Sequence, residues 1–182
     1  MTKSITFPSH TEYPDYAQMY MDLVKTDGTL LDQLRTNLEK TIKLISTLSE
    51  EEINYRYAAD KWTIKEVLVH IIDDERIYAY RAMAFARNDK TVLPGFDQND
   101  YTMFAASSSR TLKNILTEYK AVRMATIALF DGFSEKALMR IGTADGKMAS
   151  VRALGYHIAG HELHHIKIIK ERYLKLLLRN CN

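Results

Sequence analysis

The sequence predicts an all-α protein, built as a single four-helix bundle domain. Its 182 residues contain only three prolines, Pro8, Pro14 and Pro94, which leaves two long stretches free of proline. Apolar residues recur at steps of three and four in four long segments, which is the spacing of one helix face. No segment alternates convincingly with the two-residue period of a strand, so the helices should pack on one another.

We divide the chain into three parts. Residues 1–28 form a lead-in, which contains a short helix from Asp15 to Lys25. Residues 29–178 form the bundle, and residues 179–182 form a terminal tail. The first long helix is expected over residues 29–48, where the apolar stripe consists of Leu30, Leu31, Leu34, Leu38, Ile42, Ile45 and Leu48. After it, Ser49-Glu50-Glu51-Glu52 predicts a capping box and a short helical turn.

The second long helix has a well-marked start. Thr63 and Glu66 have the spacing of a capping box, and Trp62 with Val67 has that of a hydrophobic staple. This helix should run to about Arg87, with an apolar stripe of Val67, Ile71, Tyr78, Ala82 and Phe85.

Polar side chains share that inward face. His70, Asp74 and Arg81 all lie within about 60° of the centre of the stripe. Such groups must pair or bind something when they are buried. One alternative is a buried Asp74–Arg81 ion pair with His70 at the rim, and the other is a ligand site.

Residues 89–100 form the longest break in periodicity and should connect two helices over one end of the bundle. The third long helix is expected from about Ser109 to Asp131, before Gly132. Residues 133–149 are expected to be irregular, apart from a brief helix capped by Ser134. The fourth long helix should begin after the N-cap Ser150 and end near residue 178.

Four of the six histidines fall in the fourth helix. At about 100° per residue, its apolar side chains cover about 20–120° measured from His157. His161 lies at about 40° and His165 at about 80°, inside this stripe, whereas His164 lies at about −20°. Two imidazoles four residues apart on a core-facing side suit a shared divalent ion, although a single core histidine is usually only hydrogen-bonded.

Bundles build metal sites from side chains on facing helices. The expected ligands are His70 on the second long helix with His161 and His165 on the fourth. Three neutral imidazoles and an open position favour a divalent transition metal, with zinc or nickel first and iron, manganese or copper as alternatives.

The segment His161-Glu162-Leu163-His164-His165 also matches the H-E-x-x-H motif of zinc proteases. Only 17 residues follow it, without a histidine and with Glu171 as the one acid. A third ligand from downstream and a strand to bind peptide are both missing, so we do not expect a protease.

Composition and charge limit the classes of partner and the cellular setting that we expect for this chain. The formal net charge of +2 gives no electrostatic case for nucleic acid. No apolar run is long enough to span a membrane, and the first residues lack a signal-peptide core. The single cysteine, Cys181, cannot form an internal disulfide, so a reducing cytoplasm is the expected setting.

The assembled motifs resemble the DinB/YfiT-like superfamily over roughly residues 30–177. The resemblance rests on several segments together, namely residues 60–70 (DKWTIKEVLVH), 73–81 (DDERIYAYR), 93–97 (LPGFD), Tyr101, Arg123 and 157–165 (HIAGHELHH). It implies a four-helix bundle, often dimeric, with a divalent metal on three histidines that match His70, His161 and His165. Asp74 departs from the family pattern, which has a small or hydroxyl residue there.

Some members of this superfamily are S-transferases that use a low-molecular-weight thiol such as bacillithiol or mycothiol. We therefore expect a metal-dependent S-transferase or a hydrolase acting on a small electrophilic molecule. Asp74, Glu75 and Asp97 are acid/base or outer-shell candidates, and the substrate-binding candidates are Arg81, Tyr78 and Tyr101. The alternative is a non-catalytic, stress-related protein that binds a metal or a small molecule.

A homodimer is also expected. The chain has 11 tyrosines and 8 methionines, which is many for a core of this size, and both are common at interfaces. The alternative is that these side chains belong to the core and surface of a monomer.

Overall fold

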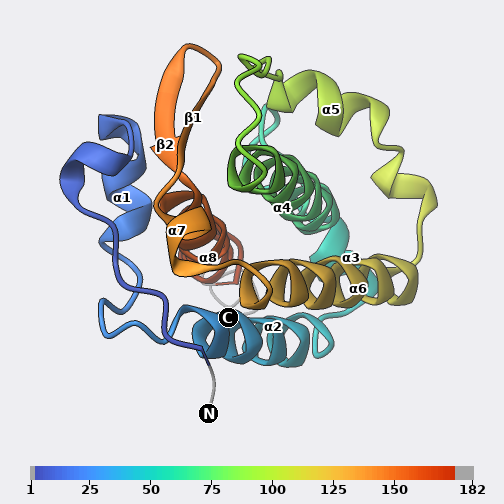
Figure 1. Cartoon of the computed structure of the whole chain (residues 1–182). Helices are drawn as coiled ribbons and strands as arrows, with labels where there is room; N and C mark the ends of the chain where they lie inside the picture. Colours follow the sequence, from blue (N-terminus) through green and yellow to red (C-terminus); the bar gives the residue numbers. More distant parts are fainter. Residues whose placement is uncertain (1–2, 175–182) are drawn as a thin grey trace.

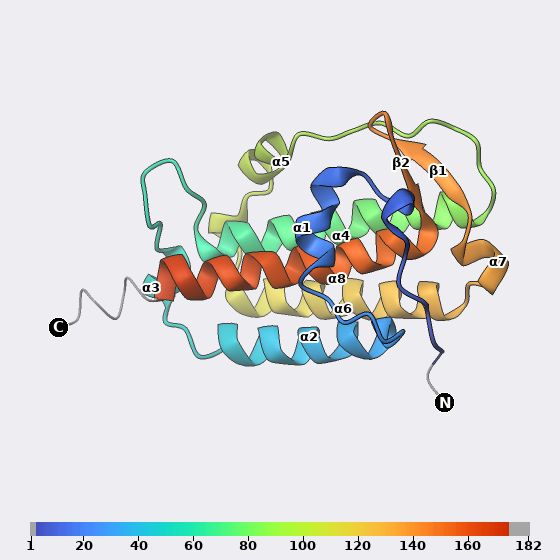
Figure 2. The same cartoon turned by 90° about the vertical axis from the view of Figure 1, so that its left-hand side faces the viewer.

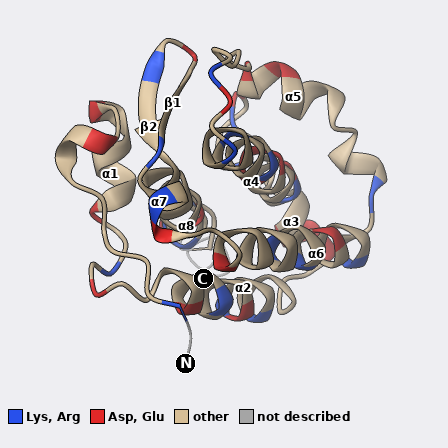
Figure 3. Cartoon of the chain, in the orientation of Figure 1, with Lys and Arg blue, Asp and Glu red and all other residues tan. Residues whose placement is uncertain are grey.

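The fold was obtained as a computed structural model that describes residues 3–174. Four long helices form the bundle, namely α2 (Leu30–Ile45), α4 (Ile64–Ala86), α6 (Leu112–Asp131) and α8 (Val151–Ile168). Figure 1 looks roughly along the bundle, Figure 2 shows it from the side, and Figure 3 marks its charged residues in the view of Figure 1. Helix α4 packs on α6 and α8, and α2 packs on the same two helices, so α2 and α4 occupy opposite corners. The predicted all-α four-helix bundle is confirmed.

Short elements fill the connections. Two 3-10 turns (His10–Glu12 and Asp15–Ala17) lead into α1 (Gln18–Met21), which lies against α8. Helix α3 (Glu50–Asn54) precedes α4, and α7 (Glu135–Leu138) follows α6. Helix α5 (Gln98–Phe104) begins within the predicted break of residues 89–100, and a 3-10 turn (Ser107–Ser109) follows it; neither was predicted.

The predicted helix starts are present in the structure. The capping boxes of Ser49 with Glu52 and of Thr63 with Glu66 are both complete. The Ser150 hydroxyl accepts from the backbone N–H of Ala153 and so begins α8. Each cap satisfies backbone donors that a helix cannot pair internally.

The expectation of an irregular segment before α8 was wrong. Strands β1 (Ile141–Ala144) and β2 (Lys147–Ser150) form an antiparallel hairpin, in which Ile141 pairs with Ser150. The turn residues Asp145 (φ 54°) and Gly146 (φ 68°) both have positive φ, as a tight two-residue hairpin turn requires. The hairpin stands beside the N-terminal end of α8, next to α1 (Figure 1).

Helix α8 changes its hydrogen-bonding pattern near its end. Its α-helical hydrogen bonding stops at Ile168, and a π-helical turn continues it to Leu174. The predicted end near residue 178, the terminal tail and Cys181 lie outside the described residues. Within residues 3–174, no helix is long and apolar enough to cross a membrane.

Candidate metal centre

The structure brings together the three histidines that the helix angles selected. One ring nitrogen from each of His70, His161 and His165 lies within 4.8 Å of the other two, and we call these residues the histidine cluster. His161 Nε2 is 3.1 Å from His70 Nε2 and 3.1 Å from His165 Nε2. The cluster therefore joins α4 to α8 deep in the bundle, and His164 is not part of it.

Hydrogen bonds among the three imidazoles cannot satisfy all of their ring nitrogens. His161 Nδ1 faces the carboxylate of Asp74 at 3.3 Å, which favours the tautomer with its proton on Nδ1. In that tautomer Nε2 carries one lone pair and can accept from only one of its two imidazole neighbours. A divalent ion bound at about 2.0–2.1 Å would accept all three lone pairs, with nitrogens about 3.0–3.4 Å apart. The donor set therefore fits such an ion.

Burial keeps the cluster neutral. It lowers the pKa of His165 to about 2, with further lowering from the neighbouring imidazoles. It also lowers the pKa of His161 to about 3, against an opposing effect of Asp74, and it lowers the pKa of His70. Metal binding needs unprotonated imidazole, so these side chains are ready to bind at neutral pH without losing protons.

Asp74 lies beside the cluster and does not pair with Arg81. Its Oδ2 atom is 3.3 Å from His161 Nδ1 and 3.6 Å from His157 Nε2, and the side chain is 7 % exposed. This oxygen has no well-formed hydrogen bond within the described chain. Burial raises the pKa of Asp74, but the neighbouring His161 and His157 lower this pKa by a larger amount. The net pKa is therefore below its ordinary value, and the carboxyl group stays charged. A buried anion behind His161 suits a cation on the other side of that ring.

Helix α1 covers one side of the centre. The ring of Tyr20 meets His157, His161 and His164 edge-on, with centroids 4.9, 5.4 and 5.4 Å away. Gly160 makes this approach possible, because a Cβ atom there would lie 2.2 Å from the backbone oxygen of Tyr20. The sequence analysis did not predict that the N-terminal lead-in would contact the histidines of α8.

Glu75 and Glu162 belong to a buried ion network rather than to the metal centre. Arg123 donates to both oxygens of Glu75, at 2.9 and 3.1 Å from Nε, and to Glu162 Oε2 at 2.7 Å. Thr41 and Tyr119 donate to the other oxygen of Glu162. All three ionic side chains are at most 1 % exposed, and the network ties together all four bundle helices. The structure thus places Glu75 in this network, where its acid/base or outer-shell role stays a prediction, and both oxygens of Glu162 are occupied by donors.

The remaining predicted residues lie away from the cluster. The Asp97 side chain accepts from the backbone N–H groups of Asn99 and Asp100 and thereby caps α5, and its acid/base or outer-shell role stays a prediction. Tyr101 packs on Phe96, with ring centroids 5.2 Å apart. Arg81 and Tyr78 lie together around a different cavity, described below.

A cavity of about 230 Å³ gives access to the cluster, and we call it the His165 cavity. Its lining includes His165 itself together with Tyr57, Trp62, Asn99 and Tyr173. The sequence gave no signal for this cavity, because its walls come from α4, α5, α8 and the loop before α4.

Fold and site together define a helical bundle with a buried three-histidine centre able to hold a divalent ion. The chain belongs to the DinB superfamily, whose sequence profile matches residues 33–169. A relative from Oceanobacillus iheyensis, named "putative metal-dependent hydrolase", is 24% identical over 143 residues, which cover 77% of this chain and 81% of the relative.

The fold is also similar to a solved structure. YfiT from Bacillus subtilis, described as "a probable metal-dependent hydrolase with an unusual four-helix bundle topology", superimposes with a TM-score of 0.67. The match covers 94% of both chains at 12% sequence identity, so it supports the bundle architecture alone.

Proposed function

We propose that this protein is a metal-dependent hydrolase that acts on a small electrophilic substrate. The observation that carries the proposal is the convergence of three neutral imidazole nitrogens within 4.8 Å, next to an accessible cavity. A divalent ion on three protein ligands supplies Lewis acidity that lowers the pKa of a nucleophile. The names of the relative and of YfiT agree with this reaction class.

Protein groups around the centre have distinct roles in this proposal. The Asp74 carboxylate, 3.3 Å from His161 Nδ1, favours the tautomer that leaves the Nε2 lone pair free for the cluster. Tyr20 and Trp62 shield the imidazoles from water, since the Trp62 ring lies 4.9 Å from that of His70. The substrate enters through the His165 cavity, where His165 is the ligand nearest to solvent.

Thiol transfer is the second candidate function. The His165 cavity, about 230 Å³, is larger than a single nucleophilic water requires, and it has room for a low-molecular-weight thiol. The same Lewis acidity would favour the thiolate, which is the nucleophilic form of a thiol. The third possible outcome of the experiment below is that the protein binds a metal or a small molecule without catalysing a reaction.

The test is turnover by the metal-loaded protein, after the bound metal has been identified by elemental analysis. A panel of small esters, amides and lactones tests hydrolysis, and a chlorinated aromatic or an epoxide with added thiol tests transfer. We expect hydrolysis that disappears on chelation and returns on adding back zinc or nickel. Turnover only with a thiol would establish the transferase instead, and metal binding without turnover of either panel would contradict an enzymatic role.

A variant pair provides the control. His165→Ala should abolish metal-dependent turnover, because it removes a ligand that also lines the cavity. His164→Ala should retain it, because His164 is the neighbouring imidazole outside the cluster. Equal loss in both variants would show that the assay follows folding and not the metal centre.

A further inference from the structure

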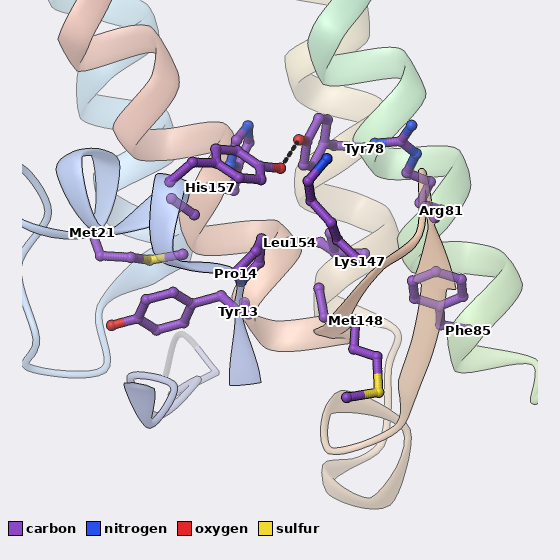
Figure 4. A pocket seen from close by; sticks show the side chains of 15 residues that line it. Tyr13, Pro14, Met21, Tyr78, Arg81, Phe85, Lys147, Met148, Leu154 and His157 are labelled. Carbon is purple, nitrogen blue, oxygen red and sulfur yellow. Dashed lines mark hydrogen bonds between the residues drawn. The ribbon is translucent and has the colours of Figure 1, made fainter. Parts of the chain in front are cut away.

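A second cavity lies one helical turn away from the histidine cluster, between α1, α4, α8 and the hairpin. Figure 4 shows its lining, which includes Tyr16, Tyr78, Arg81, Lys147, Leu154 and His157, and we call it the Arg81 cavity. None of the cluster histidines lines it. No aspartate or glutamate of the described chain lines it either, although two cations do.

Arg81 is a buried cation that forms no salt bridge within the described chain, although the Asp145 carboxylate is close enough to interact with its charge. Arg81 is only 6% exposed, and no carboxylate within residues 3–174 forms a salt bridge with its guanidinium. Of its five N–H donors, one donates to the backbone oxygen of Pro94 at 3.0 Å. The guanidinium also lies 5.1 Å from the centroid of the Tyr78 ring. A buried guanidinium with spare donors is costly unless an anion completes its hydrogen bonds.

Further donors border the same space. The hydroxyls of Tyr16 and Tyr78 are 2.9 Å apart, so at least one of them can turn its proton to a ligand. Lys147 Nζ lies 5.6 Å from the centroid of the Tyr16 ring. Asp145 offsets part of this positive charge, because its carboxylate accepts from Lys147 at 2.8 Å. Figure 4 shows Lys147, Tyr78 and Arg81 around the same cavity.

The rest of the lining is apolar and the enclosed space is small. Phe85, Leu154, Met148 and Met21 lie on the walls (Figure 4). The enclosed volume is about 30 Å³. A carboxylate is a smaller anion than a phosphate group, so this limited space favours a carboxylate. The apolar side chains on these walls can pack against a short hydrocarbon chain.

We infer that the Arg81 cavity binds the carboxylate of a small aliphatic monocarboxylic acid, with Arg81 as its principal partner. Lys147 and the paired hydroxyls of Tyr16 and Tyr78 complete the polar end, and the apolar walls cover the chain. The site is separate from the histidine cluster and does not depend on hydrolysis. Its failure would therefore leave the proposed function untouched.

The test is isothermal titration calorimetry of the purified full-length protein with sodium butyrate at neutral pH. Butyramide is the neutral probe of the same shape, and inorganic phosphate is the competing anion. We expect saturable binding of butyrate, at least tenfold weaker binding of both other probes, and an unchanged butyrate affinity after the metal is removed with a chelator. Loss of binding on chelation would mean that butyrate sits on the metal, and would overturn the inference, as would equal affinity for butyramide or tighter binding of phosphate.

Variants locate the site. Arg81→Gln should remove butyrate binding, but it also removes the bond to Pro94 and can disturb folding. Lys147→Gln avoids that difficulty, because the Lys147 side chain is 47 % exposed. This substitution should weaken butyrate binding roughly tenfold through the loss of one charge-assisted contact. Lys136→Gln removes an equivalent charge from exposed α7 and should have no effect. Unchanged binding in Lys147→Gln, or equal weakening in Lys136→Gln, would overturn the assignment.

Discussion

Replacement of Glu162 by glutamine distinguishes a structural glutamate from the general base of an H-E-x-x-H protease. In the structure both oxygens of Glu162 are occupied. Thr41 and Tyr119 donate to Oε1, and Arg123 donates to Oε2 at 2.7 Å. Glutamine keeps the shape and one acceptor oxygen, but its NH2 group must then face one of these donors.

The expected loss of stability follows from these contacts. One hydrogen bond to a charged group disappears, which costs about 1.5–3 kcal/mol. The network has one positive and two negative side chains, so removal of one buried negative charge offsets part of this cost. We therefore expect Glu162→Gln to lower the free energy of unfolding by about 1–3 kcal/mol, out of a total of about 5–15 kcal/mol.

Urea denaturation of the chelator-treated protein measures this change without a contribution from bound metal. Glu171→Gln is the matched control. Glu171 is exposed, lies just after α8 and has no hydrogen bond or ion pair within the described chain, so its loss should stay within about 0.5 kcal/mol. An unchanged unfolding free energy in Glu162→Gln, combined with complete loss of hydrolysis, would refute the structural role and restore the protease base.

Four further predictions concern the centre and the assembly. Alanine in place of any cluster histidine should remove most of the bound metal, and His164→Ala should retain it, as measured by elemental analysis after identical purification. Asp74→Asn should weaken metal affinity about 10–100-fold in a chelator competition, and an unchanged affinity would contradict the role given to its carboxylate. Burial lowers the pKa of His161 to about 3, so the unfolded metal-free chain takes up protons below pH 6.5. His161 alone should then lower the free energy of unfolding by up to about 1.4 kcal/mol per pH unit between about pH 6.5 and 3. His165 and His70, whose pKa values are also lowered, should add to this fall, and a flat urea midpoint would oppose it. Light scattering should give twice the 21.0 kDa chain mass, since Met103 and Phe104 are 67% and 80% exposed, and a monomer mass would refute the dimer.

The hairpin shows what local sequence signals could have supplied. Asp145-Gly146 is a strong two-residue turn signal, and it lies between the segments that became β1 and β2. The strands themselves are four residues each, too short for an alternating pattern to stand out. A bridge from Leu93 to Ala144 ties the hairpin to the loop before α5, and no local pattern encodes that contact.

The sequence by itself determined the four long helices, the caps that begin two of them and the inward direction of His161 and His165. Capping boxes and the 3.6-residue period act within one helix, so Thr63, Glu66 and the turn between His161 and His165 could be evaluated from local spacing. The same period separated His165 from His164. These features follow from the backbone geometry of a single helix, so residues close together in the sequence are enough to predict them.

Only the tertiary structure decided which buried charges meet. Asp74, Glu75 and Arg81 all lie on α4, yet the first faces His161, the second pairs with Arg123, and the third lines a separate cavity. Their partners come from helices far away in the sequence. The pairing depends on the rotation and axial shift of one packed helix against another, and core packing fixes both only after all four helices have assembled.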